Sequence, residues 1–326
     1  MTEPENNAHK VTVPVLLIAF RRYDNTKLVI DTLREAKVSR VYFSCDGGRN
    51  EEEWQQVERV RSLVDQFDWD CELITKFNSE NRGCRYNPSE SISWFFDNEP
   101  EGIILEDDII ADVTFFSFCQ ELLAKYRDDS RIWAINGHSW ATTQSAEHDD
   151  SYYFSSHSYG AYWGWATWAR TWNKFDLDMK QWPEVKKSGL LNDYYLSNDE
   201  ARHANHFFDI SWGGFDTWDY QFDFAKIINN GLNIVPSISL TRNIGFEADA
   251  THTFKKEEIH YRGNYSSMKF PLVHPKCMLV NTKRELRFFR RFIKPRWMRR
   301  MKNFVRSILP RRLNEIITAN QWKMHQ

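Results

Sequence analysis

Apolar, β-branched runs alternate with amphipathic segments along the N-terminal third of the chain. Four runs have the composition and length of buried strands: Val11–Phe20, Val41–Ser44, Cys71–Thr75 and Gly102–Leu105. Three segments between them have the spacing of helices: about 24–36, 51–67 and 88–97. Parallel strands are joined by right-handed helical crossovers, so the alternation predicts an α/β, Rossmann-like fold with a mostly parallel central sheet flanked by helices.

Length and composition bound the domain organisation. The chain has 326 residues, of which 41% are hydrophobic, so it can bury one sizeable core with a smaller appendage. We expect one domain over residues 1–282, followed by a helical tail over residues 283–326.

The cysteines and the N-terminus indicate the compartment. The five cysteines are scattered, their number is odd and no Cys-x-x-Cys pair occurs, so neither a disulfide framework nor a zinc site is predicted. Residues 1–10 are polar and lack the apolar core of a signal peptide, and no apolar run is long enough to span a bilayer. The sequence therefore predicts a soluble or peripheral cytoplasmic protein.

A run of three acids, Glu106-Asp107-Asp108, directly follows the predicted strand Gly102–Leu105. In α/β sheets, ligand sites form beyond the carboxyl ends of the strands. Three neighbouring carboxylates repel one another unless a cation neutralises them. A hard divalent ion such as Mg²⁺ or Mn²⁺ suits oxygen ligands and leaves positions open for a diphosphate. The run therefore predicts a metal and diphosphate site, and an acidic turn or helix start is the alternative interpretation.

The order of these strands and motifs resembles the glycosyltransferases of the GT-A fold, which use nucleotide-sugar donors. The three-acid form of the motif is especially similar to the N-acetylglucosaminyltransferase I group of inverting enzymes, and the chain also resembles bacterial surface-polysaccharide glycosyltransferases. The resemblance covers about residues 11–253. It implies a donor half at about 11–112 and an acceptor half at about 113–255.

The resemblance also implies positions for the nucleotide-sugar site. They are Phe20, Arg21 and Arg22 after the first strand, Asp46 after the second, Asn81 and Gly83 in an Asn-x-Gly turn, the acids Glu106, Asp107 and Asp108, and the segment Trp163, Gly164 and Trp165. Arginine suits phosphate through its charged fork, and a Trp ring can stack on a sugar. The alternatives are a surface loop for the arginines, a turn before glycine for Asp46 and a packed core turn for the Trp-Gly-Trp segment.

Two further assignments concern the metal and the catalytic base. The resemblance implies a Mn²⁺ or Mg²⁺ ion with Asp108 as its direct ligand, and His252, which follows the polar segment 241–245, could complete the metal shell or touch the diphosphate. Inverting transfer requires a base that removes the proton of the acceptor hydroxyl, and an Asp beside a Trp has this role in similar enzymes. Asp219 is the first candidate and Asp216 the second, although either could instead cap the helix that follows.

The C-terminal segment is strongly basic. Residues 283–326 contain 14 Lys or Arg and two Glu, with aromatic residues interleaved. A basic amphipathic helix suits an anionic membrane surface, and a nucleic-acid arm is the rival interpretation. With a glycosyltransferase body the membrane is favoured, so we expect no nucleic-acid partner and peripheral association with the cytoplasmic face of the inner membrane.

The sequence thus predicts a metal-dependent, inverting glycosyltransferase. It would move a hexosyl or N-acetylhexosaminyl group from a nucleotide diphosphate sugar, with UDP favoured by analogy, to a hydroxyl of a glycan or a lipid-linked oligosaccharide. Bacterial surface polysaccharide synthesis is the expected setting. The alternatives are a nucleotidyltransferase that makes nucleotide sugars and a non-catalytic sugar-binding protein that kept the fold. Residues Phe20–Thr26 contain no Gly, which argues against the Gly-rich phosphate loop of the nucleotidyltransferases.

Overall fold

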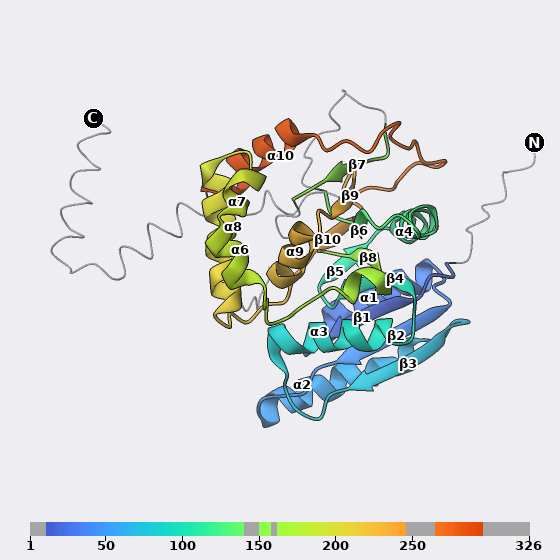
Figure 1. Ribbon diagram of the computed structural model, residues 1–326. Helices are drawn as coiled ribbons and strands as arrows, with labels where there is room; N and C mark the ends of the chain where they lie inside the picture. The colour runs from blue at the N-terminus through green and yellow to red at the C-terminus, as the bar shows by residue number, and fades with distance from the viewer. Residues whose placement is uncertain (1–10, 140–149, 158–161, 246–264, 296–326) are drawn as a thin grey trace, which may run out of the picture. The chain divides into compact units, whose positions relative to one another are not determined.

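The structure is a computed structural model that describes residues 11–139, 150–157, 162–245 and 265–295 (Figure 1). The chain forms two compact units, and each is described by itself. The first unit comprises Met1–Pro183 and Phe207–Asn281, and the second comprises Glu184–His206 and Thr282–Gln326.

An eight-stranded sheet runs through the first unit in the order β3-β2-β1-β4-β8-β6-β9-β7. Its strands are β1 (Val15–Ala19), β2 (Arg40–Cys45), β3 (Glu72–Phe77), β4 (Glu101–Glu106), β6 (Ile132–Asn136), β7 (Tyr152–Ser155), β8 (Trp165–Trp168) and β9 (Leu232–Pro236). The first four strands in this order are parallel, as are β6 and β9, whereas β8 and β7 are antiparallel to their neighbours. The predicted α/β fold with a mostly parallel central sheet is confirmed.

Helices cover both faces of this sheet (Figure 1). Those within the first unit are α1 (Tyr23–Glu35), α2 (Glu51–Arg61), the 3₁₀ helix η1 (Ser62–Gln66), α3 (Gly83–Phe96), α4 (Val113–Lys125), α5 (Ala169–Trp172) and α9 (Asp219–Ile228). The boundaries between the two units fall inside α6 (Trp182–Ser188) and α8 (Asn198–Trp212), so each of these helices contributes residues to both units.

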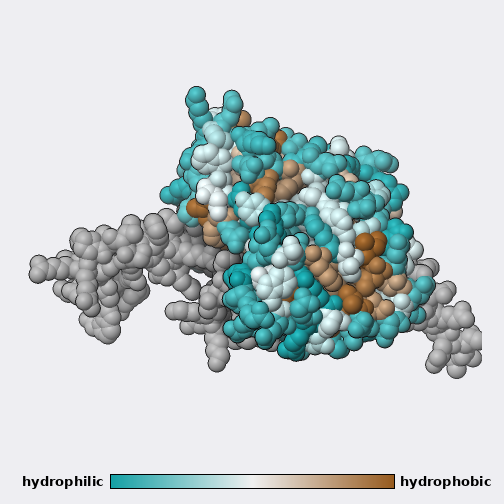
Figure 2. Space-filling model, turned by 90° about the horizontal axis from the view of Figure 1, so that it is seen from below, coloured by the Kyte–Doolittle hydropathy of each residue, from teal (hydrophilic) through white to brown (hydrophobic). Residues whose placement is uncertain are grey.

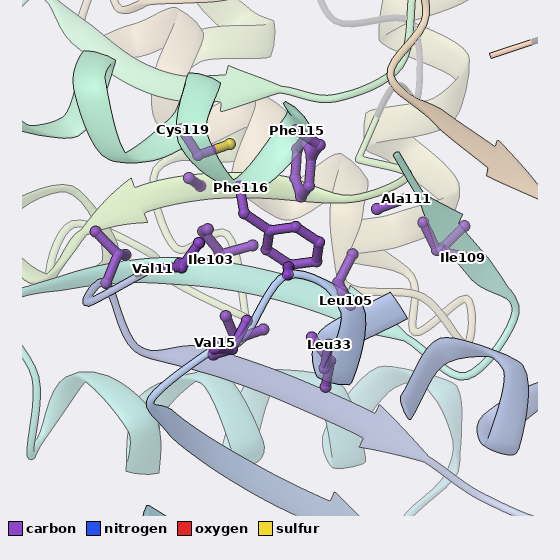
Figure 3. Packing of buried hydrophobic residues seen from close by; sticks show 14 of the residues in the cluster. Val11, Val15, Leu33, Ile103, Leu105, Ile109, Ala111, Phe115, Phe116 and Cys119 are labelled. Carbon is purple, nitrogen blue, oxygen red and sulfur yellow. The ribbon is translucent and has the colours of Figure 1, made fainter. Parts of the chain in front are cut away.

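The side chains of each central strand alternate between two apolar cores, as the strand period requires. Leu105 of β4 enters the core that α1, α2 and α4 cover, whereas Ile104 enters the core that α3 and α9 cover. Figure 3 shows the first core, in which the Phe116 ring of α4 lies over β4 near Ile103 and Leu105. Because both faces are buried, the central strands read as continuous apolar runs, which is why they could be located from the sequence.

One helix and one small sheet depart from the sequence pattern. Helix α3 begins at Gly83, ahead of the predicted start at Pro88, because Asp216 from a distant segment accepts a hydrogen bond from the backbone of its first turn. The short strands β5 (Ile109–Ala111) and β10 (Thr241–Asn243) pair antiparallel in a separate two-stranded sheet. Neither feature has a local signal, since each depends on a partner far away in the sequence.

The second unit contains part of the predicted basic tail. It includes α7 (Leu190–Tyr194), α10 (Thr282–Phe288) and a π-helical turn, η3 (Phe289–Ile293). The buried ring of Phe289 lies edge-on to His203, and Lys294 forms an ion pair with Asp199. The described part of the tail therefore packs with residues 184–206 in one unit. Residues 296–326 lie outside the described residues.

One face of the molecule is shown in Figure 2. On the face shown in Figure 2, hydrophilic residues predominate and hydrophobic residues form small patches. No helix in the described ranges has the length and apolar character needed to cross a membrane.

Candidate active site

The ends of β1 and β4 lie side by side at the carboxyl edge of the sheet. Ile18 of β1 pairs with Glu106, the last residue of β4, and the chain then turns through Asp107 and Asp108 into β5. The backbone N–H of Phe20, just beyond β1, donates to Asp107 Oδ2 at 3.1 Å. The strand pairing therefore holds the backbone of Phe20 against the acidic run.

Arg22 is the counterion of two of the acids. Its Nη1 atom lies 3.3 Å from Asp107 Oδ1 and 3.0 Å from Asp108 Oδ2, and its side chain is 26% exposed. Burial lowers the pKa of Arg22, but the charges of the two carboxylates outweigh burial and raise it overall. Arg22 thus stays protonated and neutralises about one of the negative charges at this edge.

Asp108 is enclosed by the strand that follows β9. The backbone N–H of Ile244, next to β10, donates to the carbonyl oxygen of Asp108 at 2.8 Å. A Cβ atom built on Gly245 would lie 2.2 Å from Asp108 Oδ2, so only glycine fits there. The other carboxylate oxygen, Oδ1, is buried and has no partner within the described ranges. A buried carboxylate oxygen without a donor is costly, which points to a ligand or cation that the site is built to bind.

The acids are short of positive charge. Burial, followed by repulsion from Asp108 and Asp107, raises the pKa of Glu106 to about 8. Burial and repulsion from Asp108 likewise raise the pKa of Asp107 to about 6. The pKa of Asp108 is also raised, by burial, although Arg22 acts against it. Perturbed carboxylates at a strand end are typical of functional sites rather than of satisfied turns.

Asp219 lies close to this cluster although it is distant in the sequence. It begins α9, and its carboxylate accepts hydrogen bonds from the Thr217 hydroxyl and from the backbone N–H of Tyr220. Burial raises the pKa of Asp219. Its charge is among those that raise the pKa of Glu106, so the two carboxylates lie near enough to interact electrostatically. A carboxylate whose pKa is raised in this way suits a general base.

Cys84, near the start of α3, belongs to the same neighbourhood. The residue is exposed overall, yet burial of the thiol and the nearby carboxylates Glu106, Asp216 and Asp219 raise its pKa to about 12. The thiol is therefore protonated and unreactive at neutral pH. Its electrostatic partners show that α3, β4 and the segment before α9 converge.

Asp216 has a different task from Asp219. Its Oδ1 atom accepts from the backbone N–H of Arg85 at 2.7 Å and so caps the first turn of α3. The buried guanidinium of Arg85 in turn donates through Nη1 to the carbonyl of Ser211 at 3.0 Å. The structure thus engages Asp216 in joining two segments and leaves Asp219 as the carboxylate closer to the acids.

Asp46, at the end of β2, is saturated with hydrogen bonds. Its carboxylate accepts from the backbone N–H groups of Gly47, Arg82 and Gly83 and from the side-chain amides of Asn78 and Asn81. Two predicted nucleotide-site residues, Asn81 and Gly83, are therefore partners of a third one. These contacts order the turn between β3 and α3. They agree with the alternative interpretation of Asp46 as a residue that stabilises a turn.

The side chains of the two predicted arginines contact different carboxylates. Arg21 pairs with Glu53 of α2 at 3.1 Å, while Arg22 turns to the acids. A hydrogen bond from Arg49 and the nearby Arg21 charge hold the pKa of Glu53 at about 2. Arg21 therefore fixes α2 to the end of β1 and lies apart from the acidic cluster.

The Trp-Gly-Trp segment is largely a packing element. Trp165 is buried and stacks on Trp218, with ring centroids 5.7 Å apart. Gly164 has φ +70°, and a Cβ atom there would meet the Thr241 side chain at 2.8 Å. Only Trp163 is half-buried, and its ring lies 4.8 Å from the buried His138 ring. Burial assigns Trp165 to the core, whereas Trp163 is only partly buried.

The donor set fits a divalent ion that is shared with a diphosphate. The described ranges contain no group of three or more His, Cys, Asp or Glu arranged as a metal shell. Mg²⁺ and related ions commonly take one or two protein carboxylates and complete their shell with water and phosphate oxygens. Asp107 and Asp108, with the buried unpartnered oxygen Oδ1, supply such a pair. His252 lies outside the described residues, and the last described residue before it is Gly245, beside Asp108.

Sequence reasoning missed Arg85, Cys84 and Gly245. Arg85 and Cys84 follow the predicted Asn-x-Gly turn, but nothing local indicates their distant partners. Gly245 does end a polar segment, yet its contact with Asp108 requires the pairing of β10 with β5. A contact of this kind becomes visible only in the fold.

Comparisons with known proteins add little to this geometry. No protein-family model matches the chain, and no curated protein matches it. Among solved structures, it is similar to HddC from Yersinia pseudotuberculosis, at 10% identity and a TM-score of 0.31 over 49% of this chain and 78% of that one. It is also similar to the glycosyltransferase GlyE of Streptococcus pneumoniae TIGR4, at 13% identity and a TM-score of 0.27 over 77% and 59%. A UDP-glucose pyrophosphorylase complexed with UDP-glucose matches at 6% identity and 0.28 over 50% and 79%. At these values no functional argument rests on the likeness.

Proposed function

We propose that this protein is a metal-dependent, inverting glycosyltransferase that moves a sugar from a nucleotide diphosphate sugar to a saccharide hydroxyl. The observation that carries the proposal is the convergence of Asp219 with the acids at the end of β4. This reaction requires two parts, a cation site and a general base. The acids after β4, with the unpartnered oxygen of Asp108, would supply the cation site. Asp219, a nearby carboxylate of raised pKa, would supply the base.

In this proposal the donor half holds the nucleotide diphosphate. Asp107 and Asp108 would hold a Mn²⁺ or Mg²⁺ ion, which supplies neutralisation of the departing diphosphate when bound. Arg22, which contacts both acids, is in reach of the same phosphates through its guanidinium fork. The backbone at Phe20 and the turn that Asp46 orders would border the nucleotide. His252 is proposed as a further contact.

Asp219 performs the proton transfer. Its carboxylate is held by Thr217 and by its own helix start, so its position is fixed before the acceptor arrives. It removes the proton of the acceptor hydroxyl while that oxygen forms the bond to the anomeric carbon and the diphosphate leaves. The raised pKa makes it a stronger base than an ordinary aspartate.

A nucleotidyltransferase remains the second candidate. The neighbourhood of Arg22 fits it less well, because no Gly-rich loop follows β1 to cradle a triphosphate. Such an enzyme also has no need of a base directed at an acceptor hydroxyl. A non-catalytic sugar-binding protein would have no use for the unpartnered oxygen of Asp108.

The donor, setting and membrane contact extend the proposal. UDP is favoured as the nucleotide, the transferred group is a hexose or N-acetylhexosamine, and a glycan or lipid-linked oligosaccharide of a bacterial surface polysaccharide is the acceptor. Arg287 and Arg290 of the second unit are exposed and cationic, whereas Phe289 is buried within that unit. Contact with an anionic inner-membrane surface would therefore rely on charge. Flotation with anionic liposomes should be lost when residues 283–326 are deleted, and equal flotation of both proteins would refute the contact.

Turnover of nucleotide sugars tests the proposal directly. The protein is incubated with UDP-, GDP- and dTDP-sugars and Mn²⁺, and released nucleotide and sugar are separated by chromatography. We expect metal-dependent release from one donor class and none from Asp108→Ala, with the exposed Asp128→Ala as matched control. NMR of the product anomer reports inversion. Pyrophosphate release from a nucleoside triphosphate and a sugar 1-phosphate would instead identify a nucleotidyltransferase.

A further inference from the structure

A short chain of hydrogen bonds leads to the proposed base at the start of α9. The Thr217 hydroxyl donates to Asp219 Oδ1, and the backbone N–H of Tyr220 donates to the same oxygen at 3.0 Å. The side-chain amide of Gln221 donates through Nε2 to the carbonyl oxygen of Thr217 at 2.8 Å. Gln221 therefore reaches the base through one intermediate residue.

Packing contacts place this chain of hydrogen bonds over the strand that carries the acids. The buried ring of Trp218, the residue before the base, stacks on Trp165 with ring centroids 5.7 Å apart. Trp165 pairs with Ile104 of β4, and Glu106, two residues further along this strand, has its side chain on the same face as Ile104. Ile104 and Trp218 belong to one apolar core. The start of α9 thus lies on the face of the sheet toward which Glu106 points.

The segment that carries Thr217 is fixed on both sides. Before it, Asp216 accepts from the backbone N–H of Arg85 at 2.7 Å. After it, the ring of Trp218 is buried. Thr217 is half-buried, and its hydroxyl has one hydrogen to donate, which goes to Asp219 Oδ1. A hydroxyl on a segment held in this way can fix the orientation of the carboxylate.

Gln221 uses only half of its amide. Its side chain is fully buried, yet Oε1 has no hydrogen-bond partner in the described ranges. A buried acceptor without a donor costs free energy, and an apolar side chain of similar length would not carry this cost. Such costs are typical of positions that function requires. The amide is therefore better explained by its contact with Thr217 than by the stability of α9.

The two donors contact one oxygen of the Asp219 carboxylate. Oδ1 accepts from Thr217 and Tyr220, and neither of these groups contacts Oδ2. An oxygen that already accepts two hydrogen bonds is a poorer proton acceptor, because its lone pairs are engaged. Asp219 is partly exposed, as a residue that meets a substrate must be. The arrangement therefore distinguishes the two oxygens of the base.

We propose that Thr217 and Gln221 are positioning residues for Asp219 and that Oδ2 is the atom that takes the acceptor proton. The assignment rests on the proposed glycosyltransferase function. The O–H bond of the acceptor breaks, its proton passes to Oδ2, and its oxygen bonds to the anomeric carbon. The diphosphate leaves with the electron pair of its bond to that carbon. Thr217 holds Oδ1, so the carboxylate is already oriented when the acceptor arrives.

The test measures Mn²⁺-dependent hydrolysis of UDP-glucose, GDP-mannose and dTDP-glucose, with water as the acceptor. Thr217→Val removes the hydroxyl at similar shape and should lower kcat by about 10- to 100-fold, because the carboxylate can then rotate. KM for the donor should stay unchanged, since Thr217 does not contact the diphosphate in this proposal. Thr217→Ser keeps the hydroxyl and should restore most of the activity.

The pH dependence supplies a readout that a purely structural role would not move. The Thr217 hydroxyl lowers the pKa of the Asp219 carboxyl, against the effect of burial. In Thr217→Val this pKa should therefore rise, and the acid limb of the pH profile of kcat should move to higher pH. Carbon-13 NMR of the Asp219 carboxyl measures the same change without a donor.

Thr114 provides a matched control at the start of α4. Its hydroxyl and its backbone N–H donate to Asp112 Oδ1, so it forms the same type of Thr–Asp pair two residues apart. Thr114→Val should lower Tm and leave the pH profile and the Asp219 pKa unchanged.

Gln221→Met separates positioning from stability. The variant loses the contact with Thr217 and also loses the unpartnered oxygen Oε1, and these two effects offset one another. Tm should therefore stay within about 2 °C of wild type, while kcat falls by a smaller factor than in Thr217→Val.

Several outcomes would overturn the inference. They are an unchanged kcat or an unchanged Asp219 pKa in Thr217→Val, a loss that Thr217→Ser does not restore, and the same pH shift in Thr114→Val. Wild type that hydrolyses none of the donors would refute the proposed function and this inference with it. Turnover that Asp219→Asn abolishes and Thr217→Val leaves intact would refute this inference alone.

Discussion

The carboxyl ends of β2 and β4 both present acids at the same edge of the sheet, but the two ends are built in opposite ways. Asp46, after β2, is buried and accepts hydrogen bonds from backbone and amide donors on both of its oxygens. Asp108, after β4, receives one contact from Arg22 and keeps a buried oxygen without a partner among the described residues. Two aspartates that follow neighbouring parts of the same sheet edge therefore differ in how many of their hydrogen bonds are made.

The difference supports a structural role for Asp46 and the proposed functional role for Asp108. A carboxylate with all of its hydrogen bonds made stabilises the fold and has nothing left for a ligand. Carboxylates that are buried, close together and short of donors destabilise the unliganded protein, and such a cost is maintained where ligand binding needs it. The end of β2 thus anchors the turn before α3, and the end of β4 is where we propose the chemistry takes place.

The largest expected effect lies at the β4 end and concerns the base. Asp219→Asn should lower the turnover number of nucleotide-sugar transfer by about 10²–10⁴-fold, because the acceptor hydroxyl then loses its proton acceptor. Donor binding should change little, since Asp219 does not contact the diphosphate in this proposal. The matched control is Asp216→Asn, which should mainly weaken the start of α3 and reduce turnover far less. A greater loss in Asp216→Asn than in Asp219→Asn would exchange their roles.

A stability measurement tests the contrast between the two strand ends. Asp46→Ala should lower the free energy of unfolding by about 3 kcal/mol, because it leaves several buried N–H donors without an acceptor. Asp108→Ala should change it by less than about 1 kcal/mol, because removing one of several like charges offsets the lost contact with Arg22. Urea denaturation of both variants gives the comparison. Equal losses would mean that the acids after β4 are structural as well.

The pH dependence of stability should reside at the β4 end. The pKa of Glu106 is raised from its usual value near 4.5 to about 8, so the folded protein binds a proton that the unfolded chain releases. Its contribution is fully present below pH 4.5 and is lost as pH rises toward 8, so the apo protein becomes less stable through that window. Glu106→Gln should flatten the dependence and raise the free energy of unfolding at pH 8 by roughly 1–2 kcal/mol. Melting temperatures from pH 5 to 8.5 provide the measurement, and a parallel curve for the variant would contradict the assignment.

The smallest expected effect concerns the counterion. Arg22→Ala should tighten Mn²⁺ binding in the absence of nucleotide by about three- to tenfold, since the guanidinium no longer competes for Asp107 and Asp108. The same variant should bind nucleotide diphosphate more weakly. Arg21→Ala, whose partner is Glu53, should leave Mn²⁺ affinity unchanged. Electron paramagnetic resonance of free Mn²⁺ measures the Mn²⁺ affinity of both variants. Weaker Mn²⁺ binding in Arg22→Ala would show that Arg22 supports metal binding instead of competing with it.

The fold was predictable where local pattern decides it. Strands β1, β2 and β4 are buried on both faces, so their apolar runs marked them, and the acids after β4 followed from the strand order. What the sequence could not supply is the set of long-range pairs. The contact of Gly245 with Asp108 and the cap of Asp216 on α3 each join segments that only the finished fold brings together.

The same limit explains the mixed outcome at the candidate site. Asp46 was predicted at the nucleotide site from its place after a strand, and the structure adds that its carboxylate accepts hydrogen bonds from the distant amides of Asn78 and Asn81. Trp165 was predicted at the sugar site, and the structure adds that its ring is buried and stacks on Trp218. Both assignments stay predictions, and the local sequence could not indicate these contacts.

We propose that Asp108 holds a cation together with a nucleotide diphosphate, and a thermal-shift titration can decide this. Wild type, Asp108→Ala and the exposed control Asp128→Ala are heated with UDP, GDP or dTDP, each with and without Mn²⁺. We expect one nucleotide to raise Tm by about 5 °C at saturating concentration, only with Mn²⁺, in wild type and Asp128→Ala but not in Asp108→Ala. No shift with any nucleotide, or an equal shift in Asp108→Ala, would contradict it and make the acids after β4 a structural turn.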